Sequence, residues 1–319
     1  MKTRLTELLR IDVPVMLAGM GGVSYSALVA AVSGAGGFGC LGASTMSSDE
    51  LVAEIARVRA ATDRPFGVDL LTAFPESLER NVELSIEGGA AVFVAGLGVP
   101  RRVIETCHRH HVLVMSLCGK VEHARRALDS GCDAVIAQGT EAGGHTGTVA
   151  TMPLVPLVVD AVGETIPVVA AGGIFDGRGL AAALALGADG IWIGTRFIAT
   201  PEARAVRGFK ERILAEAEDA TTISRAYTGK TMRVLRNERT DRYDANPTLL
   251  RPFPEQLAIS LADGSFHLGG DSSTPDVDET IEVYPAGQSV GGIGELVGAG
   301  DLVTRINAQA ETILARLAR

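Results

Sequence analysis

Eight short apolar runs recur along the first two thirds of the chain, and each ends in glycine or a polar turn. Within a run, hydrophobic residues are nearly continuous, which is typical of strands buried on both faces of a parallel sheet. Successive runs start 21 to 33 residues apart, which leaves room for one helix between each pair. The expected strands cover 13–19, 37–43, 65–71, 90–98, 111–118, 133–139, 166–174 and 190–197.

Helical patterns fill the intervals between these runs. A capping serine, Ser48, opens one pattern whose Leu51, Ile55 and Val58 share a face, and further patterns cover 122–128 and 180–186. Eight strand–helix alternations predict an α/β protein with a (β/α)8 TIM barrel. A doubly wound open sheet is the alternative.

The pattern changes after residue 200. Residues 204–219 read as one charged helix, and a polar stretch interrupted by prolines follows. We expect residues 206–284 to form a small, mostly helical lobe over the barrel mouth. The barrel would then comprise residues 1–205 and be completed by residues 285–319, with a closing amphipathic helix over 302–318.

Charge and cysteine content narrow the function classes. The formal net charge is −9 and no basic stripe occurs, which argues against a nucleic-acid partner. The four cysteines form no C-x-x-C pair, so a reduced, cytoplasmic protein without a metal site is expected. The uncharged stretch 13–48 resembles a membrane anchor, but its eight glycines favour a buried barrel segment and no membrane insertion.

Glycine-rich turns follow the last two expected strands. The sequence AGGI at 171–174 precedes a helix that opens with DGRG, and GTRF occupies 194–197. In a TIM barrel these two loops form the usual phosphate site, because glycine lets backbone N–H groups approach the phosphate oxygens. A phosphate-bearing ligand is therefore expected. The G-x-G-x-x-G match at 34–39 is no dinucleotide fingerprint, because it ends a helix and opens a strand.

A long glycine-rich loop follows the sixth expected strand and carries His145. It is the only histidine at a strand end, and imidazole suits proton transfer near neutral pH. At the end of the third expected strand, Asp69 could hydrogen-bond a ligand ring or cap a turn. Purine-nucleotide dehydrogenases share the phosphate layout but need a cysteine in the sixth loop, and residues 140–151 contain none.

Taken together, these motifs resemble the FMN-dependent nitronate monooxygenases, formerly called 2-nitropropane dioxygenases, and the related FMN-dependent type II enoyl-ACP reductases. The shared segments include PFGVDLL, DAVIAQGTEAGGHTG, IPVVAAGGIFDGRG and IGTRFIAT, and extend to AGQSVGGI near the end. The resemblance implies a barrel that holds one FMN, with His145 as the catalytic residue. By position, the FMN site would comprise Ala18, Gly19, Met20, Gln138 and Gly144 along the flavin and Gly172, Gly173, Gly194 and Thr195 at the phosphate.

One departure concerns Asp69, because the family often has asparagine at this position. An ionised carboxylate there would disfavour a negatively charged reduced flavin. The leading hypothesis is oxidation of alkyl nitronates or nitroalkanes with O2. The alternatives are an NAD(P)H-dependent flavin reductase of enoyl thioesters or quinones, and a flavin-binding protein without turnover. The sequence leaves the oligomeric state open, a homodimer included.

Overall fold

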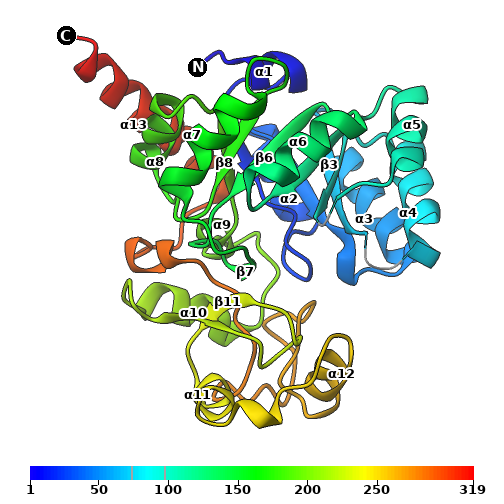
Figure 1. Cartoon of the computed structure of the whole chain (residues 1–319), viewed down its shortest axis with the longest axis vertical. Coiled ribbons are helices and arrows are strands. Elements are labelled where there is room, and N and C mark those ends of the chain that lie inside the picture. Colours follow the sequence, from blue (N-terminus) through cyan, green and yellow to red (C-terminus); the bar gives the residue numbers. More distant parts are fainter. Residues whose placement is uncertain (73–74, 97) are drawn as a thin grey trace.

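Eight parallel strands form the centre of the computed structural model, which describes residues 1–72, 75–96 and 98–319 (Figure 1). In the sheet they follow the order β1-β9-β8-β6-β5-β4-β3-β2, and a bridge between Met16 and Phe38 joins the two outer members. The expected (β/α)8 barrel is thereby confirmed, and every expected run contains its strand. The strands are β1 Val15–Leu17, β2 Gly39–Gly42, β3 Phe66–Leu71, β4 Val92–Gly96, β5 Leu113–Cys118, β6 Ala134–Gln138, β8 Val168–Ala171 and β9 Gly190–Ile193.

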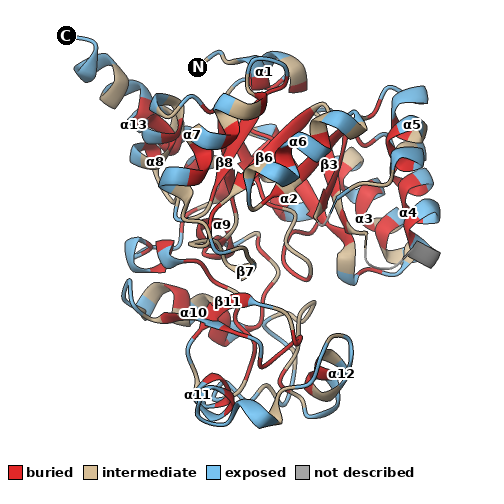
Figure 2. Ribbon diagram, viewed as in Figure 1, coloured by how far each residue is buried: buried red, intermediate tan, exposed pale blue. Residues whose placement is uncertain are grey.

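Burial on both faces explains why the apolar runs are continuous. Met16, Phe38 and Met115 belong to one apolar cluster that includes residues of most barrel strands. The neighbouring strand residues Val15 and Leu17 belong instead to a larger cluster shared with the surrounding helices. Alternate side chains of one strand therefore belong to two different cores. Figure 2 shows the buried strands in red at the centre of the barrel.

Helices surround the barrel and leave its carboxyl end to the loops. They are α1 Arg4–Leu9, α2 Ser26–Gly34, α3 Ser48–Ala61, α4 Pro75–Glu87, α5 Arg101–Arg109, α6 Val121–Ser130, α7 Thr151–Val162, α8 Gly177–Ala185, α9 Thr195–Ile198 and α13 Ala299–Leu317, with the 3-10 turns η1 Ala43–Thr45 and η3 Gln288–Gly292. The side chain of Ser47, and not of Ser48 as expected, caps α3, because it accepts the N–H of Glu50 at 3.2 Å. The glycines at 34–39 do end α2 and precede β2.

Residues 206–284, called the lobe below, lie beyond the carboxyl ends of the barrel strands (Figure 1). Helices α10 Arg207–Ala215, α11 Glu238–Ala245 and α12 Glu255–Ala262, with the 3-10 turn η2 Pro247–Leu249, accompany a hairpin of β10 Thr221–Ser224 and β11 Met232–Leu235. The charged helix expected over 204–219 is shorter, because the backbone is already extended at Glu216. Strand β7, Gly144–His145, leaves the barrel and pairs antiparallel with β11.

Close backbone contact joins the first barrel loop to the lobe. Gly22 has a φ of +80°, and a Cβ atom there would lie 2.3 Å from the amide nitrogen of Gly269. Only glycine satisfies both conditions without strain. Within the described residues, no helix combines the length and apolar character that crossing a membrane requires.

The substitution Gly22→Ala should therefore lower the free energy of unfolding by about 1–3 kcal/mol, because it adds backbone strain and separates the loop from Gly269. Gly34→Ala is the matched control, since nothing lies within 4 Å of a Cβ atom there and the residue is helical. Urea denaturation of both variants checks this. Equal midpoints for the two variants would contradict the contact.

Candidate active site

A group of unpaired backbone donors lies where β8 and β9 end. The N–H groups of Gly172, Gly173, Gly194 and Thr195 find no acceptor among the described residues. Gly172 and Gly173 have φ values of +104° and +73°, which glycine adopts without strain. Unpaired N–H groups at strand and helix ends are typical of anion sites, and a phosphate is the anion that the glycine-rich motifs predict here.

The carboxylate of Glu141 fixes the loop next to these donors. It accepts the N–H of Thr151 at 2.8 and 3.0 Å and the Thr151 hydroxyl at 2.9 Å, and thereby caps the start of α7. The Thr151 hydroxyl oxygen is also 3.1 Å from the carbonyl oxygen of Gly172. Glu141 belongs to the motif that carries His145, but its role here is to join the loop after β6 to the end of β8.

His145 is held by its backbone on two sides. It pairs with Met232 across the β7–β11 ladder, and its carbonyl accepts the side-chain amide of Gln138 at 2.9 Å. Arg233, next along β11, is buried and donates to the carbonyl of Thr140 at 2.9 Å. The loop after β6 is therefore fixed to the lobe.

The surroundings of the imidazole favour its neutral form. The residue is exposed at the barrel mouth, but its Nε2 is 3.0 Å from the buried hydroxyl oxygen of Thr228. Loss of solvent around the ring, and secondly the nearby Lys230 ammonium, lower the pKa of His145 below its usual 6.5. A neutral imidazole at pH 7 can accept a proton, which is what a general base requires.

Asp69 lies on β3 against the loop that follows β1. A Cβ atom on Gly19 would be 2.2 Å from the Cβ of Asp69, so only glycine permits this approach. Among the described residues, the carboxyl group has no hydrogen-bond or ion-pair partner, and burial raises the pKa of Asp69 to about 8. A pKa above neutrality favours the uncharged form of this carboxyl group at pH 7.

The carboxyl ends of β1 and β9 meet beside Asp69. A Cβ atom on Gly194 would lie 3.2 Å from the sulfur of Met20 and 3.6 Å from the Cβ of Ala18. Ser24 fixes this turn, because its hydroxyl donates to the carbonyl of Ala18 at 2.8 Å and accepts the N–H of Met20 at 3.1 Å. The structure therefore brings Ala18, Gly19, Met20, Asp69 and Gly194 together.

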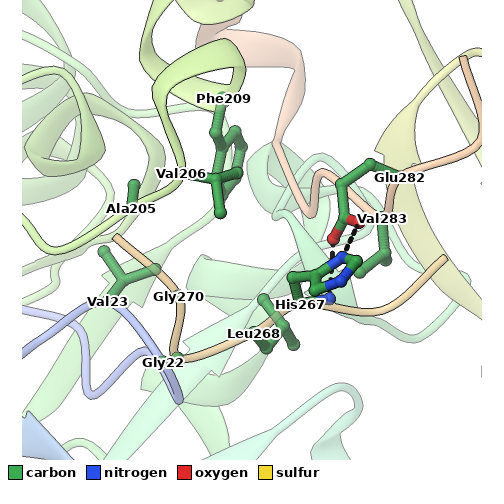
Figure 3. A pocket seen from close by; sticks show the side chains of 11 residues that line it. Gly22, Val23, Ala205, Val206, Phe209, His267, Leu268, Gly270, Glu282 and Val283 are labelled. Atoms are coloured by element: carbon green, nitrogen blue, oxygen red, sulfur yellow. Dashed lines mark hydrogen bonds and ion pairs between the residues drawn. The ribbon is translucent and has the colours of Figure 1, made fainter. Parts of the chain in front are cut away.

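A second histidine lies in a different pocket, between the first barrel loop and the lobe (Figure 3). His267 donates its backbone N–H and its ring Nδ1–H to the buried carboxylate of Glu282, at 2.8 and 2.6 Å. The sequence did not place His267. The structure shows it holding the segment that contacts Gly22.

Thr228 and Lys230 are the functional candidates that the sequence analysis missed. They lie 83 and 85 residues after His145, in a polar stretch with no motif. No group of three metal-ligating side chains occurs in the part of the chain that the structure describes.

Comparisons with known proteins point to one family. The family model described as "Nitronate monooxygenase" matches residues 2–308. The chain is 44% identical over 246 residues to a (3aS,4S,5R,7aS)-5-hydroxy-7a-methyl-1-oxo-octahydro-1H-indene-4-carboxyl-CoA dehydrogenase of Mycobacterium tuberculosis, which covers 77% of this chain and 69% of that protein.

Two solved structures are similar over almost the whole chain. FabK from Thermotoga maritima has a TM-score of 0.88 at 33% identity, and covers 100% of this chain and 99% of its own. Nitroalkane oxidase from Streptomyces ansochromogenes has a TM-score of 0.87 at 32% identity, and covers 98% of this chain and 99% of its own.

The raised pKa of Asp69 predicts a pH-dependent effect on the flavin-free protein. Unfolded aspartate ionises near pH 3.9 and folded Asp69 near pH 8, so wild-type folding loses free energy as the pH rises between these values. Asp69→Asn should therefore gain stability relative to wild type over this range, by at most about 1.4 kcal/mol per pH unit, and level off above pH 8. Denaturation between pH 4 and 9 measures it.

The exposed control Asp63→Asn should show a flat difference from wild type over the same range. A flat difference for Asp69→Asn as well would mean that the Asp69 carboxyl group ionises normally in the folded protein.

Proposed function

Because this chain belongs to the nitronate monooxygenase family and is therefore an oxidoreductase, we propose that it is an FMN-dependent nitronate monooxygenase that oxidises alkyl nitronates or nitroalkanes with O2. The observation that carries the proposal is the position of His145 on the loop after β6, which Glu141 and Thr151 join to the unpaired N–H groups at the end of β8. The surroundings of His145 lower its pKa. A carbon acid bound over the barrel mouth would meet a base there. The substrates are small molecules, and the proposal requires no nucleic-acid or membrane partner.

The residues at the mouth suit FMN. The unpaired N–H groups of Gly172, Gly173, Gly194 and Thr195 match a phosphate. No atom lies within 4 Å of a Cβ position on Gly144, so a ring system has room beside that backbone. Bound FMN would supply the acceptor for the substrate's electrons.

The neutral Asp69 would contribute a hydrogen-bond donor to this ring. Its hydroxyl proton has no acceptor among the described residues, and it lies against Gly19 at the mouth. A neutral carboxylic acid that donates a hydrogen bond stabilises negative charge on its partner, as a carboxylate could not.

His145 would act on the substrate itself. Its free Nδ1 takes the α-proton of a nitroalkane, and the C–H electron pair moves into the nitro group to form the nitronate. His145 is then an imidazolium, and its positive charge stabilises the negative charge on the nitronate oxygens. With a preformed nitronate as substrate, no proton is transferred and His145 stays a neutral side chain beside the anion.

The second candidate is hydride transfer to or from a thioester, and the 44% identity to the carboxyl-CoA dehydrogenase favours it. Protons α to a thioester carbonyl are also acidic, so the same histidine could remove one. An enoyl-thioester or quinone reductase would additionally use NAD(P)H.

Anaerobic mixing separates these candidates. The FMN-loaded protein is mixed with ethyl nitronate, nitroethane, NADH, NADPH or a saturated acyl-CoA, and the visible flavin absorbance is followed. The proposal expects bleaching by ethyl nitronate and no response to either nicotinamide. Bleaching by NADH or NADPH alone would assign the reductase activity, and bleaching by the acyl-CoA alone would assign the dehydrogenase.

Replacing the base tests the role of His145. His145→Asn should retain FMN but lower kcat for nitroethane by about 10²–10⁴-fold, the usual worth of a general base. The loss for ethyl nitronate should be smaller, since no proton is removed. In the wild type, kcat/KM for nitroethane should fall as the pH drops, with a midpoint below 6.5.

The exposed His110, at the end of α5, provides the control His110→Asn, which should match wild type. Equal losses for nitroethane and ethyl nitronate in His145→Asn would remove the proton-transfer role.

A further inference from the structure

We propose that Thr228 is a positioning residue that sets the tautomer of His145: its hydroxyl oxygen accepts the Nε2–H, so that the lone pair lies on Nδ1. The proposal rests on the proposed function, because it says which nitrogen acts as the base there. Thr228 lies in the lobe, where no sequence motif indicated a role in the chemistry.

The hydrogen bonds around the Thr228 hydroxyl favour this direction. The oxygen is 3.0 Å from His145 Nε2 and accepts the backbone N–H of Lys230 at 3.3 Å. Its own proton can go to the carbonyl oxygen of Lys230 at 3.3 Å or, more weakly, to the sulfur of Met232 at 3.9 Å. A hydroxyl has one donor and two acceptor positions, and this arrangement uses all three.

The opposite direction leaves groups unpaired. If the Thr228 hydroxyl donated to Nε2, the carbonyl of Lys230 would have no donor among the described residues. The Nδ1 nitrogen would then carry the proton and could only give it away. The direction of one hydrogen bond thus decides whether the resting His145 is a base or an acid.

The turn that carries Thr228 is fixed from the other side. Gly229 has a φ of +77°, and a Cβ atom there would lie 2.6 Å from the carbonyl oxygen of Arg251. Its own carbonyl accepts the side chain of Arg225 at 2.8 Å. His145 pairs with β11, which follows directly after this turn. His145 therefore belongs to the small sheet, and Thr228 lies in the connection between two strands of the same sheet.

Loss of solvent, and secondly the ammonium of Lys230, favour the neutral imidazole beside this hydrogen bond. The Lys230 ammonium lies 4.1 Å from the centre of the Phe253 ring and, among the described residues, has no carboxylate within ion-pair distance. The other charged groups near the loop are engaged, since Arg233 donates to Thr140 and Thr221 and Glu141 accepts from Thr151. An unpaired positive charge disfavours imidazolium, so one neutral tautomer has to be selected.

Nitrogen-15 NMR of histidine-labelled, FMN-loaded protein reads the tautomer directly. The His145 signals are identified by their loss in His145→Asn. We expect a protonated Nε2 and an unprotonated Nδ1 in the wild type above the His145 pKa. A protonated Nδ1 would overturn the proposal, whatever the substrate of the enzyme.

Variants at Thr228 test whether its hydroxyl group selects the tautomer of His145. Thr228→Val preserves shape but cannot accept the Nε2–H, so it should populate both tautomers and lower kcat for nitroethane about three- to tenfold, the equivalent of one hydrogen bond. Thr228→Ser keeps the hydroxyl and should retain the wild-type signals and rate. An unchanged tautomer in Thr228→Val would overturn the proposal. If the enzyme does not turn over nitroethane but the His145 tautomer still depends on Thr228, only the proposed substrate is refuted.

Discussion

The short pairing of Gly144–His145 with Met232–Arg233 is the interaction on which the rest of the site depends. A (β/α)8 barrel alone would leave the loop after β6 with unpaired backbone at its open end. The lobe supplies the missing strand, and buried Arg233 adds a bond to the carbonyl of Thr140. The position of His145 is therefore decided jointly by barrel and lobe, through groups 83 or more residues apart in sequence.

Desolvation at the barrel mouth shifts the pKa values of two titratable groups in favour of their neutral forms. Loss of solvent raises the pKa of Asp69 and lowers the pKa of His145, so at pH 7 one is an acid that keeps its proton and the other a base without one. The remaining polarity of the mouth comes from backbone N–H groups at the ends of β8 and β9. Such a mouth attracts anions and can receive a proton, which agrees with both a nitronate and an enolate-like substrate.

The barrel could be predicted from sequence because two-sided burial leaves a strong local pattern. Continuous apolar runs, each ended by glycine or a polar turn, located all eight strands. The β10–β11 hairpin escaped prediction because its strands are short and flanked by polar residues, so pairing and not hydrophobic pattern determines it. The roles of Glu141 and Thr228 escaped for another reason: each depends on a partner that only the folded chain brings near.

The glycines beside the unpaired N–H groups show which part of an anion site the sequence can predict and which part only the folded structure shows. The motifs at 171–174 and 194–197 predicted an anion site, since glycine is rarely needed in such numbers for turns alone. That the four N–H groups lack an acceptor is a property of the folded structure. These unpaired N–H groups give a physical reason for a phosphate to bind. That reason is separate from the family resemblance with which the FMN prediction began.

The most direct test of this account compares the affinities of the flavin-free protein for FMN and for riboflavin, measured by quenching of flavin fluorescence. The two ligands share the ring and differ in the phosphate. If the N–H groups of Gly172, Gly173, Gly194 and Thr195 bind that phosphate, FMN should bind at least tenfold more tightly, about 1.4 kcal/mol. Equal affinities, or no binding of either flavin, would contradict the account.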